Sequence, residues 1–276
     1  MEVEENIQRE YNPAHPNYER WKSARDISLD RADFVKKILS AEISLSGLNI
    51  LDIGAGEGST SMLLSENNSV ISLEPKRERL KKITTTDSLK PIQADCLNLP
   101  FKKRSFDLII LQDVIEHFDL SENFVNDVYE SLSDSGIIYF STPNRLSVFN
   151  IISDPHWGFP FLSLFNRKNV REYFIRFFRK NDYYRNDIAE LLSLGRINKI
   201  FGKQFSIKLH TRFSVNHLLI DGRGIIWSSF HLRLIKLVKK FKLEKFLLNI
   251  SNDASGVLNK FFTPTFYIIL RKKNSL

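Results

Sequence analysis

Cysteine is nearly absent from this sequence, because the 276-residue chain carries a single one, Cys96. One cysteine cannot form an internal disulfide, and it cannot build a zinc site that relies on several thiolates. Long apolar runs are missing as well, since no stretch approaches the roughly 18 residues that cross a bilayer. The acidic, polar N-terminus, MEVEENIQRE, is unlike a secretory signal peptide. We therefore expect a protein of a reducing compartment, located in the cytoplasm.

Acidic residues are scarce in the second part of the chain. Residues 1–150 hold 17 basic and 24 acidic residues, for a net charge of −7, whereas residues 151–276 hold 23 basic and 8 acidic residues, for a net charge of +15. A basic part rich in phenylalanine is typical of proteins that contact nucleic acid, an anionic membrane or a phosphorylated substrate. An ordinary solvated basic face gives the same composition.

Short apolar segments alternate with helical patterns over the first half of the chain, after a helical N-terminal cap at residues 1–45. The segments predict strands at 48–53, 69–73, 91–94, 106–111 and 137–141. They also predict helices at 59–66 and 113–132, a helix and a turn over 76–87, and a turn at 133–136. Strands that alternate with helices at this spacing predict a doubly wound α/β sheet.

After Pro143 this alternation stops. The pattern predicts helices at 169–180 and 188–201, a strand at 205–210, a long basic amphipathic helix at 225–248 and a last strand at 265–270. The long helix, which includes Trp227, has the composition of a segment that lies on an anionic membrane. A lid helix that packs its apolar face on the sheet gives the same pattern.

The turn Asp52–Gly58 (DIGAGEG) follows the first predicted strand. Glycines at this place let the backbone turn sharply and approach a ligand closely. A dinucleotide fingerprint would need Gly or Ala where this chain has Ser59, and a Walker A loop would need Gly-Lys-Ser/Thr. The sequence of this turn therefore argues against a binding site for NAD or ATP.

The segment from Asn49 to Gly58 resembles the first motif of the class I S-adenosylmethionine-dependent methyltransferases. The resemblance implies a Rossmann-like sheet of seven strands with an antiparallel last strand, and S-adenosylmethionine as the cofactor. In that family Glu74 would accept from the ribose hydroxyls and Asp95 from the adenine amino group, while the N–H of Cys96 serves a ring nitrogen. The cofactor-binding residues that it implies are Asp52, Gly54, Ala55, Gly56, Glu74, Pro75, Asp95, Cys96 and Gln112.

The segment Asp107–His117 (DLIILQDVIEH) is similar to methyltransferase type 11 and to ubiquinone-biosynthesis O-methyltransferases. The likeness covers residues 46–145 well, and these form the expected cofactor-binding core. The stretches Thr142–Arg145 and Asp154–Gly158 resemble methyltransferases of bacterial surface-glycan and lipid gene sets more loosely. Residues 146–276 are the expected acceptor-binding part of one methyltransferase domain.

Methyl transfer requires an in-line approach of the acceptor and removal of its proton. His117 and His156 are the candidate bases, because imidazole titrates near neutral pH. His117 would lie in the first turn of the helix at 113–132, where a structural role is the alternative. Asn144 and Arg145 could orient a polar acceptor. No tight cluster of histidine and acidic residues stands out in the sequence, so no metal site is expected.

Nucleic-acid base methylation is disfavoured, because Gln112-Asp113-Val114-Ile115 stands where such enzymes carry Asp/Asn-Pro-Pro-Tyr/Phe, and Cys96 is misplaced for a nucleophile. We expect methyl transfer to a small-molecule, glycan-precursor or lipid-linked acceptor at oxygen, with peripheral membrane contact through residues 225–248. An amine acceptor is the first alternative. The second is a non-catalytic module of the same fold that binds membrane or nucleic acid.

Overall fold

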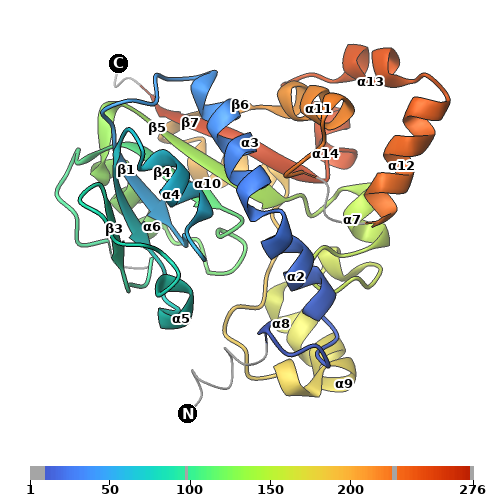
Figure 1. The fold of residues 1–276 in the computed structure, drawn as a ribbon. Helices are drawn as coiled ribbons and strands as arrows, with labels where there is room; N and C mark the ends of the chain where they lie inside the picture. The colour runs from blue at the N-terminus through green and yellow to red at the C-terminus, as the bar shows by residue number, and fades with distance from the viewer. Residues whose placement is uncertain (1–9, 97–98, 226–228, 274–276) are drawn as a thin grey trace.

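The computed structural model describes residues 10–96, 99–225 and 229–273. A seven-stranded sheet in the order β3-β2-β1-β4-β5-β7-β6 crosses the whole molecule (Figure 1). β1 to β5 are parallel to one another, whereas β7 runs antiparallel to both β5 and β6. This arrangement confirms the doubly wound sheet of seven strands with an antiparallel last strand.

The strands form where apolar runs are continuous, as is typical of strands buried on both faces. Ile50, Leu51 and Ile53 of β1 are all fully buried. The strands are β1 Asn49–Ile53, β2 Ser69–Leu73, β3 Leu89–Ile92, β4 Phe106–Gln112, β5 Leu132–Pro143, β6 Phe205–Leu209 and β7 Thr265–Lys272. The third strand begins two residues before its predicted start. The predicted turn at 133–136 falls within β5, at the place where its pairing with β4 shifts register.

Helices cover both faces of the sheet, which makes a three-layer structure (Figure 1). On one face α3 (Ser28–Ser40) and α4 (Ser59–Leu64) pack with Ile50, Leu108 and Tyr139. On the other face α6 (Glu122–Ser131) and α10 (Leu194–Phe201) pack with Leu51 and Phe140. Side chains that alternate along each strand thus enter two separate cores.

The remaining helices lie beside the sheet or in the insertions. α2 (Tyr18–Asp26) precedes α3, and α5 (Arg77–Leu80) follows β2. Between β5 and β6 the chain forms α7 (Val148–Ile152), η1 (Leu162–Leu164), α8 (Arg167–Asn169), η2 (Val170–Ile175), α9 (Arg176–Phe178) and η3 (Lys180–Asp182). Between β6 and β7 it forms α11 (Thr211–Ile220), α12 (Ser229–Lys240), α13 (Glu244–Ile250) and α14 (Val257–Phe261).

The first insertion has a core of its own. Trp157, Phe174 and Ile188 are buried together there. The helix predicted at 169–180 is present as the consecutive segments α8, η2 and α9. Figure 1 shows these segments beside α2, and Arg20 of α2 donates to the carbonyl of Pro155 at 3.5 Å. The insertion therefore meets the N-terminal cap on the side of the sheet where the carboxyl ends of the strands lie.

The helix predicted at 113–132 is wrong over its first part, because α6 begins only at Glu122. The hydroxyl of Ser121 caps α6 by accepting the N–H of Phe124 at 3.1 Å. Asp113 has a φ of +53°, a left-handed conformation that ends β4 and does not start a helix. His117 therefore lies in a loop and not in a first helical turn.

Two further helices are shorter than predicted. The segment 188–201 is helical only over α10, because residue Leu192 forms a bridge with Asn144 and Ser193 caps the helix. The segment predicted as one helix over 225–248 contains α12 and α13, with a break at Lys242, whose φ is +54°. Trp227 lies outside the described residues. Within the described residues, no helix has the length and apolar composition needed to cross a bilayer.

Candidate active site

The glycine turn between β1 and α4 uses three backbone positions that favour glycine. Gly54, Gly56 and Gly58 have φ angles of +71°, +60° and +82°. A Cβ on Gly54 would lie 2.6 Å from Cγ2 of Val114, and one on Gly58 would lie 2.6 Å from Cγ1 of Ile83. Around Gly56, in contrast, nothing lies within 4 Å of the position of a Cβ. The turn thus leaves open space at its middle glycine.

Two buried carboxylates stand at the ends of the first two strands. Glu74 accepts the N–H of Gly56 through Oε2 at 2.9 Å and the N–H of Lys76 through Oε1 at 3.0 Å. Asp52 accepts the hydroxyl of Ser61 at 2.6 Å. Burial raises the pKa of Asp52 to about 6; the hydrogen bond from Ser61 opposes this rise and the charge of Glu74 adds to it. Glu74 therefore holds the glycine turn at Gly56, and Asp52 holds the start of α4 against β1.

A cavity of about 270 Å³ opens between the glycine turn and the N-terminal helices. Trp21, Arg25 and Ser28 line its outer side. A second cavity of about 310 Å³ lies at the amino ends of β1 and β2. Ligands of parallel sheets bind at the carboxyl ends of the strands, which makes the first cavity the candidate cofactor site. The predicted residues that line it are Asp52, Gly54, Ala55, Gly56 and Gln112.

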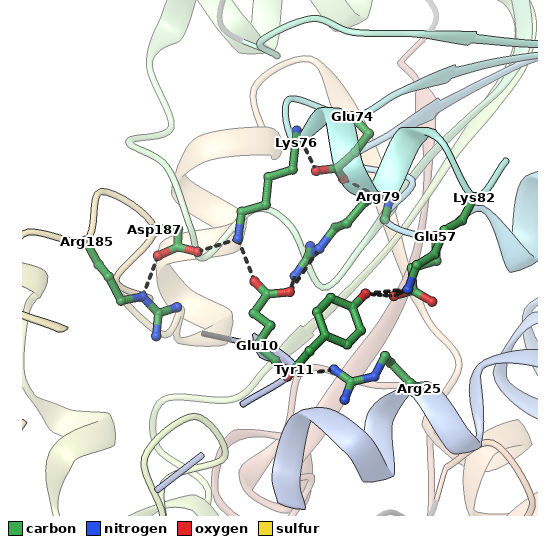
Figure 2. Close-up of polar contacts among 11 residues, drawn as sticks. Glu10, Tyr11, Arg25, Glu57, Glu74, Lys76, Arg79, Lys82, Arg185 and Asp187 are labelled. Carbon is green, nitrogen blue, oxygen red and sulfur yellow. Dashed lines mark hydrogen bonds and ion pairs between the residues drawn. The ribbon is translucent and has the colours of Figure 1, made fainter. Parts of the chain in front are cut away.

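Glu10, in the chain segment before α2, lines this cavity, and Figure 2 shows it beside Lys76 and Arg79. The carboxylate of Glu10 pairs with Lys76 at 2.6 Å and with Arg79 at 2.7 Å. Burial would raise the pKa of Glu10, but the charges and hydrogen bonds of Arg79 and Lys76 outweigh it and lower the pKa to about 2. Tyr11 donates to Glu57 of the glycine turn at 2.5 Å. The segment therefore connects α5 with the turn.

The end of β4 adds a charged pair to the cavity wall. Asp113 accepts from the hydroxyl of Ser141 at 2.7 Å, and its other oxygen pairs with Arg31 of α3. Burial would raise the pKa of Asp113, but the charge of Arg31 and the two hydrogen bonds hold it below its usual value. Gln112 accepts from the hydroxyl of Thr60 at 2.8 Å. The N-terminal cap is thus fixed to the sheet at the cavity itself.

Glu116, His117 and His156 come together beside Asp113, in what we call the Glu-His-His cluster. One ligand atom of each lies within 4.8 Å of the others. The two imidazoles meet edge to face, with ring centroids 5.2 Å apart. The expectation that histidine and acidic residues form no tight cluster is therefore wrong. The sequence did not reveal this cluster, because its members come together only when the fold brings the insertion after β5 over the end of β4.

Burial sets the protonation of this cluster. It lowers the pKa of His117, and it lowers the pKa of His156 to about 3, with the neighbouring His117 adding to the effect. Burial and the charge of Asp113 raise the pKa of Glu116 to about 8. At neutral pH both imidazoles are therefore uncharged, and Glu116 holds its proton when nothing else is bound.

Asn144 and Arg145, predicted to orient the acceptor, make contacts within the chain. The side-chain amide of Asn144 is fully buried and donates to the carbonyls of Lys260 and Thr263 at 3.0 and 2.8 Å. Arg145 pairs with Glu190 at 3.7 Å and donates to the carbonyl of Leu164. These contacts hold the insertions against the end of β5, which is the structural alternative to acceptor binding.

The predicted adenine-side residues lie outside the lining of the cavity. The carbonyl of Pro75 accepts from the amide of Gln93 at 3.1 Å. Asp95 is exposed and Cys96 is half-buried, both just after β3. Burial, with the charge of Asp95, raises the pKa of the Cys96 thiol to about 12. This thiol therefore stays protonated, as a cysteine without a nucleophilic role does.

The N-terminal part contributes residues that were not predicted from the sequence, above all Arg25, Arg31 and Glu10. Trp21, Arg25 and Ser28 are spaced by four and three residues, so they share one side of a helical segment. That spacing could have predicted that these three side chains face the same site. The ion pairs of Glu10 and Arg31 join residues 66 to 82 positions apart, and nothing in a single sequence marks such pairs.

Known proteins match the part of the chain that builds this site. The sequence profile of a family described as "Methyltransferase domain" matches residues 51–140, from β1 into β5. The mitochondrial ubiquinone biosynthesis O-methyltransferase of Rattus norvegicus is 27% identical over 111 residues, which cover 37% of this chain and 32% of that protein. The ubiquinone biosynthesis O-methyltransferase of Rickettsia typhi is 24% identical over 212 residues, which cover 69% of this chain and 79% of that protein.

The chain thus spans about a third of the length of the rat relative, and half of the relative from Rickettsia canadensis. Solved structures of low sequence identity share the whole fold. An S-adenosylmethionine-dependent methyltransferase from Mesorhizobium loti has a TM-score of 0.54 at 13% identity, over 86% of this chain and 96% of its own. One from Thermotoga maritima has a TM-score of 0.54 at 16% identity, over 93% and 95%.

The profile match covers the glycine turn and both carboxylates of the site, and the structural neighbours share the fold. These agreements confirm the fold and the S-adenosylmethionine cofactor that the motif from Asn49 to Gly58 implied. Over residues 51–140 the chain matches a methyltransferase domain, and its fold is that of the class I S-adenosylmethionine-dependent methyltransferases, enzymes whose cofactor is S-adenosylmethionine.

Proposed function

We propose that this protein transfers the methyl group of S-adenosylmethionine to a hydroxyl oxygen of a small-molecule, glycan-precursor or lipid-linked acceptor. The observation that carries the proposal is the cavity at the glycine turn, with Glu74 behind the turn and the Glu-His-His cluster next to Asp113 on its wall. A methyl donor and a group that handles a proton are then neighbours, as the reaction needs.

In this proposal the cofactor lies across the carboxyl ends of β1 to β4. Glu74 uses the lone pairs that remain beside its two backbone hydrogen bonds to accept from the ribose hydroxyls. Asp95 and the N–H of Cys96 take the adenine. The methionine end lies in the cavity, where Arg25 faces its carboxylate. The other proposed cofactor residues are Asp52, Gly54, Ala55, Gly56, Pro75 and Gln112.

Methyl transfer to a hydroxyl requires that one proton be removed from the acceptor oxygen. The acceptor oxygen forms a bond to the methyl carbon as the carbon–sulfur bond breaks, and sulfur keeps the electron pair to give S-adenosylhomocysteine. The hydroxyl proton leaves toward the Glu-His-His cluster. Of the two proposed bases, His117 is the better suited, because a group like His156 with a pKa of about 3 accepts a proton poorly at neutral pH.

Oxygen is favoured over nitrogen as the methylated atom. The two relatives described above are named O-methyltransferases. An amine acceptor remains the second proposal, since an in-line approach to the same methyl group serves both atoms. Glycan or lipid acceptors are supported by the basic second part of the chain, whose net charge is +15.

We also propose that the three parts of the chain act as one methyltransferase domain. Residues 1–45 cap the cofactor, residues 46–145 bind it, and residues 146–276 hold the acceptor and contact membrane peripherally through the α12–α13 region. Lysines 236, 239, 240, 242 and 245 accompany exposed Phe241 and Phe246 there, a composition that suits an anionic lipid surface.

Titration calorimetry with S-adenosylmethionine and S-adenosylhomocysteine tests the proposal. We expect micromolar binding of both, on the order of −8 kcal/mol, with at least a tenfold loss in Glu74→Ala. The matched control is Glu66→Ala, because the side chain of Glu66 is 61% exposed and its ion pair is with Lys36, far from the cavity lining. If the folded protein binds neither compound, the proposed enzymatic activity is wrong, and the non-catalytic binding module becomes the better proposal.

The acceptor is then sought by supplying S-adenosylmethionine with a labelled methyl group to lipid and glycan extracts. Mass spectrometry of the labelled product distinguishes an ether or ester from a methylated amine. A product methylated at nitrogen would replace the first proposal by the second.

A further inference from the structure

Residues 185–190 of the first insertion lie along the loop that carries His117. The backbone N–H of Glu190 donates to the carbonyl of Glu116 at 2.8 Å. In the same direction along both segments, Nδ1 of His117 lies 2.8 Å from the carbonyl oxygen of Asp187. The place of the proposed base is therefore set by a segment that comes 70 positions later in the chain.

The bond to Asp187 determines which nitrogen of His117 can accept a proton. A backbone carbonyl only accepts hydrogen bonds, so Nδ1 carries the hydrogen and donates it. The lone pair of the neutral ring is then on Nε2, on the other side of the imidazole. Nε2 is therefore the atom that can take the proton of the acceptor hydroxyl, as general-base catalysis requires.

Two cations hold the carboxylate of Asp187 in place, as Figure 2 shows. Its Oδ1 accepts from Nε of Arg185 at 2.8 Å, and its Oδ2 pairs with Nζ of Lys76 at 3.3 Å. Burial would raise the pKa of Asp187, but the charge and hydrogen bond of Arg185 and the charge of Lys76 outweigh it and hold the pKa well below its usual value. Asp187 is therefore ionised at neutral pH.

This fixed negative charge acts on the imidazole of His117. Burial lowers the pKa of His117, whereas the charge of Asp187 and the hydrogen bond to its carbonyl raise it. The other charged or titratable groups that face the ring are Arg185, Arg79, His156 and Glu116. An imidazole that accepts a proton becomes positive, so a carboxylate near it stabilises the product of the proton transfer.

The ring of His156, the other proposed base, is held differently. Its Nδ1 is buried without a hydrogen-bond partner. The carboxylate of Asp154 accepts the backbone N–H groups of His156 and Trp157, at 2.8 and 2.9 Å, and not the imidazole. Of the two rings, both within the described residues, that of His117 is the one whose tautomer a hydrogen bond fixes.

We propose that Asp187 is a positioning residue for the base of the proposed methyl transfer, on which this inference rests. Its carbonyl fixes the tautomer of His117, and its carboxylate stabilises the imidazolium that forms when Nε2 takes the hydroxyl proton. In a Ser-His-Asp triad one carboxylate performs both tasks, whereas here the backbone and the side chain of one residue share them. Lys76 also links this residue to the cofactor side, because its N–H donates to Glu74 at 3.0 Å.

NMR of the histidine side chains tests the proposal on the full chain without a histidine tag. The signals of His117 are those that disappear in His117→Gln, and they are followed between pH 5 and pH 9. In the parent protein we expect the nitrogen shifts of the neutral ring to place the hydrogen on Nδ1. Asp187→Asn keeps the carbonyl and the size of the side chain but removes the charge.

The loss of this charge should lower the pKa of His117, because the charge favours the protonated ring. The side chain of Asp187 is 37% exposed, so water screens part of its effect. We therefore expect a decrease of roughly half a pKa unit or more. Asp187→Glu retains the charge and should keep the pKa of His117 close to that of the parent protein.

Glu172→Gln is the matched control, because it removes one negative charge of the same insertion, where Glu172 pairs with Arg176 at 3.4 Å. It should leave the pKa of His117 unchanged. Equal pKa values of His117 in the parent protein and Asp187→Asn, or equal decreases in Asp187→Asn and Asp187→Glu, would overturn the positioning role. A neutral ring with its hydrogen on Nε2 in the parent protein would overturn it too, and this measurement needs no variant at position 187.

The same samples are titrated with S-adenosylmethionine by calorimetry, so that the two ideas can fail separately. Cofactor binding together with an unchanged pKa of His117 in Asp187→Asn would overturn the positioning role and leave the proposed methyl transfer intact. A lowered pKa in a protein that binds no cofactor would support the effect of Asp187 on His117 and overturn the proposed methyl transfer.

Discussion

At the scale of single residues, the three glycines of the turn have different reasons to be glycine. Gly54 and Gly58 combine a positive φ with a neighbouring side chain that a Cβ would meet at 2.6 Å. Gly56 has the positive φ but open space around it. Only at Gly56 does the absence of a side chain therefore serve the cavity and not the packing of the protein.

This difference predicts the result of Gly56→Ala. An L-residue in the left-handed region costs roughly 1–2 kcal/mol, and the new methyl group would project into the proposed cofactor space. We expect that loss of unfolding free energy in urea, together with at least tenfold weaker S-adenosylmethionine binding. Gly47→Ala is the control: Gly47 also has a positive φ and open space, but it precedes β1, at the opposite end of the strand. Equal effects of both variants on cofactor affinity would contradict the assignment.

Asp52 predicts a dependence of stability on pH. Its pKa of about 6 in the folded protein lies above its usual 3.8, chiefly because of burial. The folded state therefore holds the proton more tightly than the unfolded state, and stability is lost as the pH rises from about 4 to about 6. We expect Asp52→Asn, which carries no charge, to avoid this loss, on the order of 3 kcal/mol. Urea unfolding between pH 4 and pH 8 measures it.

The control for this prediction is Asp87→Asn, at an exposed position in the turn before β3. Its free energy of unfolding should follow that of the parent protein at every pH. If the difference between Asp52→Asn and the parent stayed constant over the whole range, the carboxyl of Asp52 would not titrate as the structure indicates.

At the scale of elements, the sequence predicted the strands better than the helices. β1 and β2 are continuous apolar runs between polar or glycine boundaries, so local composition determines their place. Val114 and Ile115 continue a helix-like pattern, yet Asp113 leaves the helical region because its carboxylate binds Ser141 and Arg31. A contact with a residue 82 positions earlier is invisible to a local pattern.

The residues of the candidate site likewise differ in whether the sequence predicts them. The glycine turn, Glu74 and Gln112 are placed by the ends of consecutive strands, and a motif can predict them. The Glu-His-His cluster exists only because the first insertion folds back over the end of β4. The break between α12 and α13 was also missed, because the amphipathic pattern runs on through Lys242 although its φ is +54°.

The α12–α13 region predicts binding to anionic vesicles. Phe241 is 64% exposed and Phe246 57% exposed, and both are surrounded by lysines in sequence. We expect cosedimentation with phosphatidylglycerol vesicles, weak binding to phosphatidylcholine vesicles, and a loss at high salt. Phe241→Ser should weaken the binding several-fold. Leu29→Ser, at a position of α3 that is 71% exposed, should leave it unchanged, and equal loss in both variants would argue against this surface.

At the scale of the whole molecule, the acidic first part of the chain and the basic second part meet beside the candidate cofactor cavity, where Asp187 pairs with Lys76. α12 and α13 lie at the edge of the molecule away from α5 and the glycine turn (Figure 1). The N-terminal part, in contrast, lines the cavity through Glu10, and the first insertion reaches Lys76, which pairs with Glu10. Asp187 of the insertion pairs with Lys76 at 3.3 Å, and Lys76 also binds Glu10, as Figure 2 shows. Lys76, the residue before α5, thus connects parts of the chain from before and after the core.

The position of Glu10 predicts that the N-terminal segment slows exchange of the cofactor. Glu10 lines the cavity and bonds Lys76 and Arg79, so a cofactor that leaves the cavity must displace a segment that these pairs hold in place. Glu10→Gln removes the charge but keeps the size. We expect S-adenosylmethionine to dissociate roughly fivefold faster, the equivalent of about 1 kcal/mol, as measured by stopped-flow displacement. The control is Glu19→Gln, at an exposed position of α2. S-adenosylmethionine should dissociate from this variant as fast as from the parent protein. Unchanged rates in Glu10→Gln would mean that the cofactor leaves by another side of the cavity.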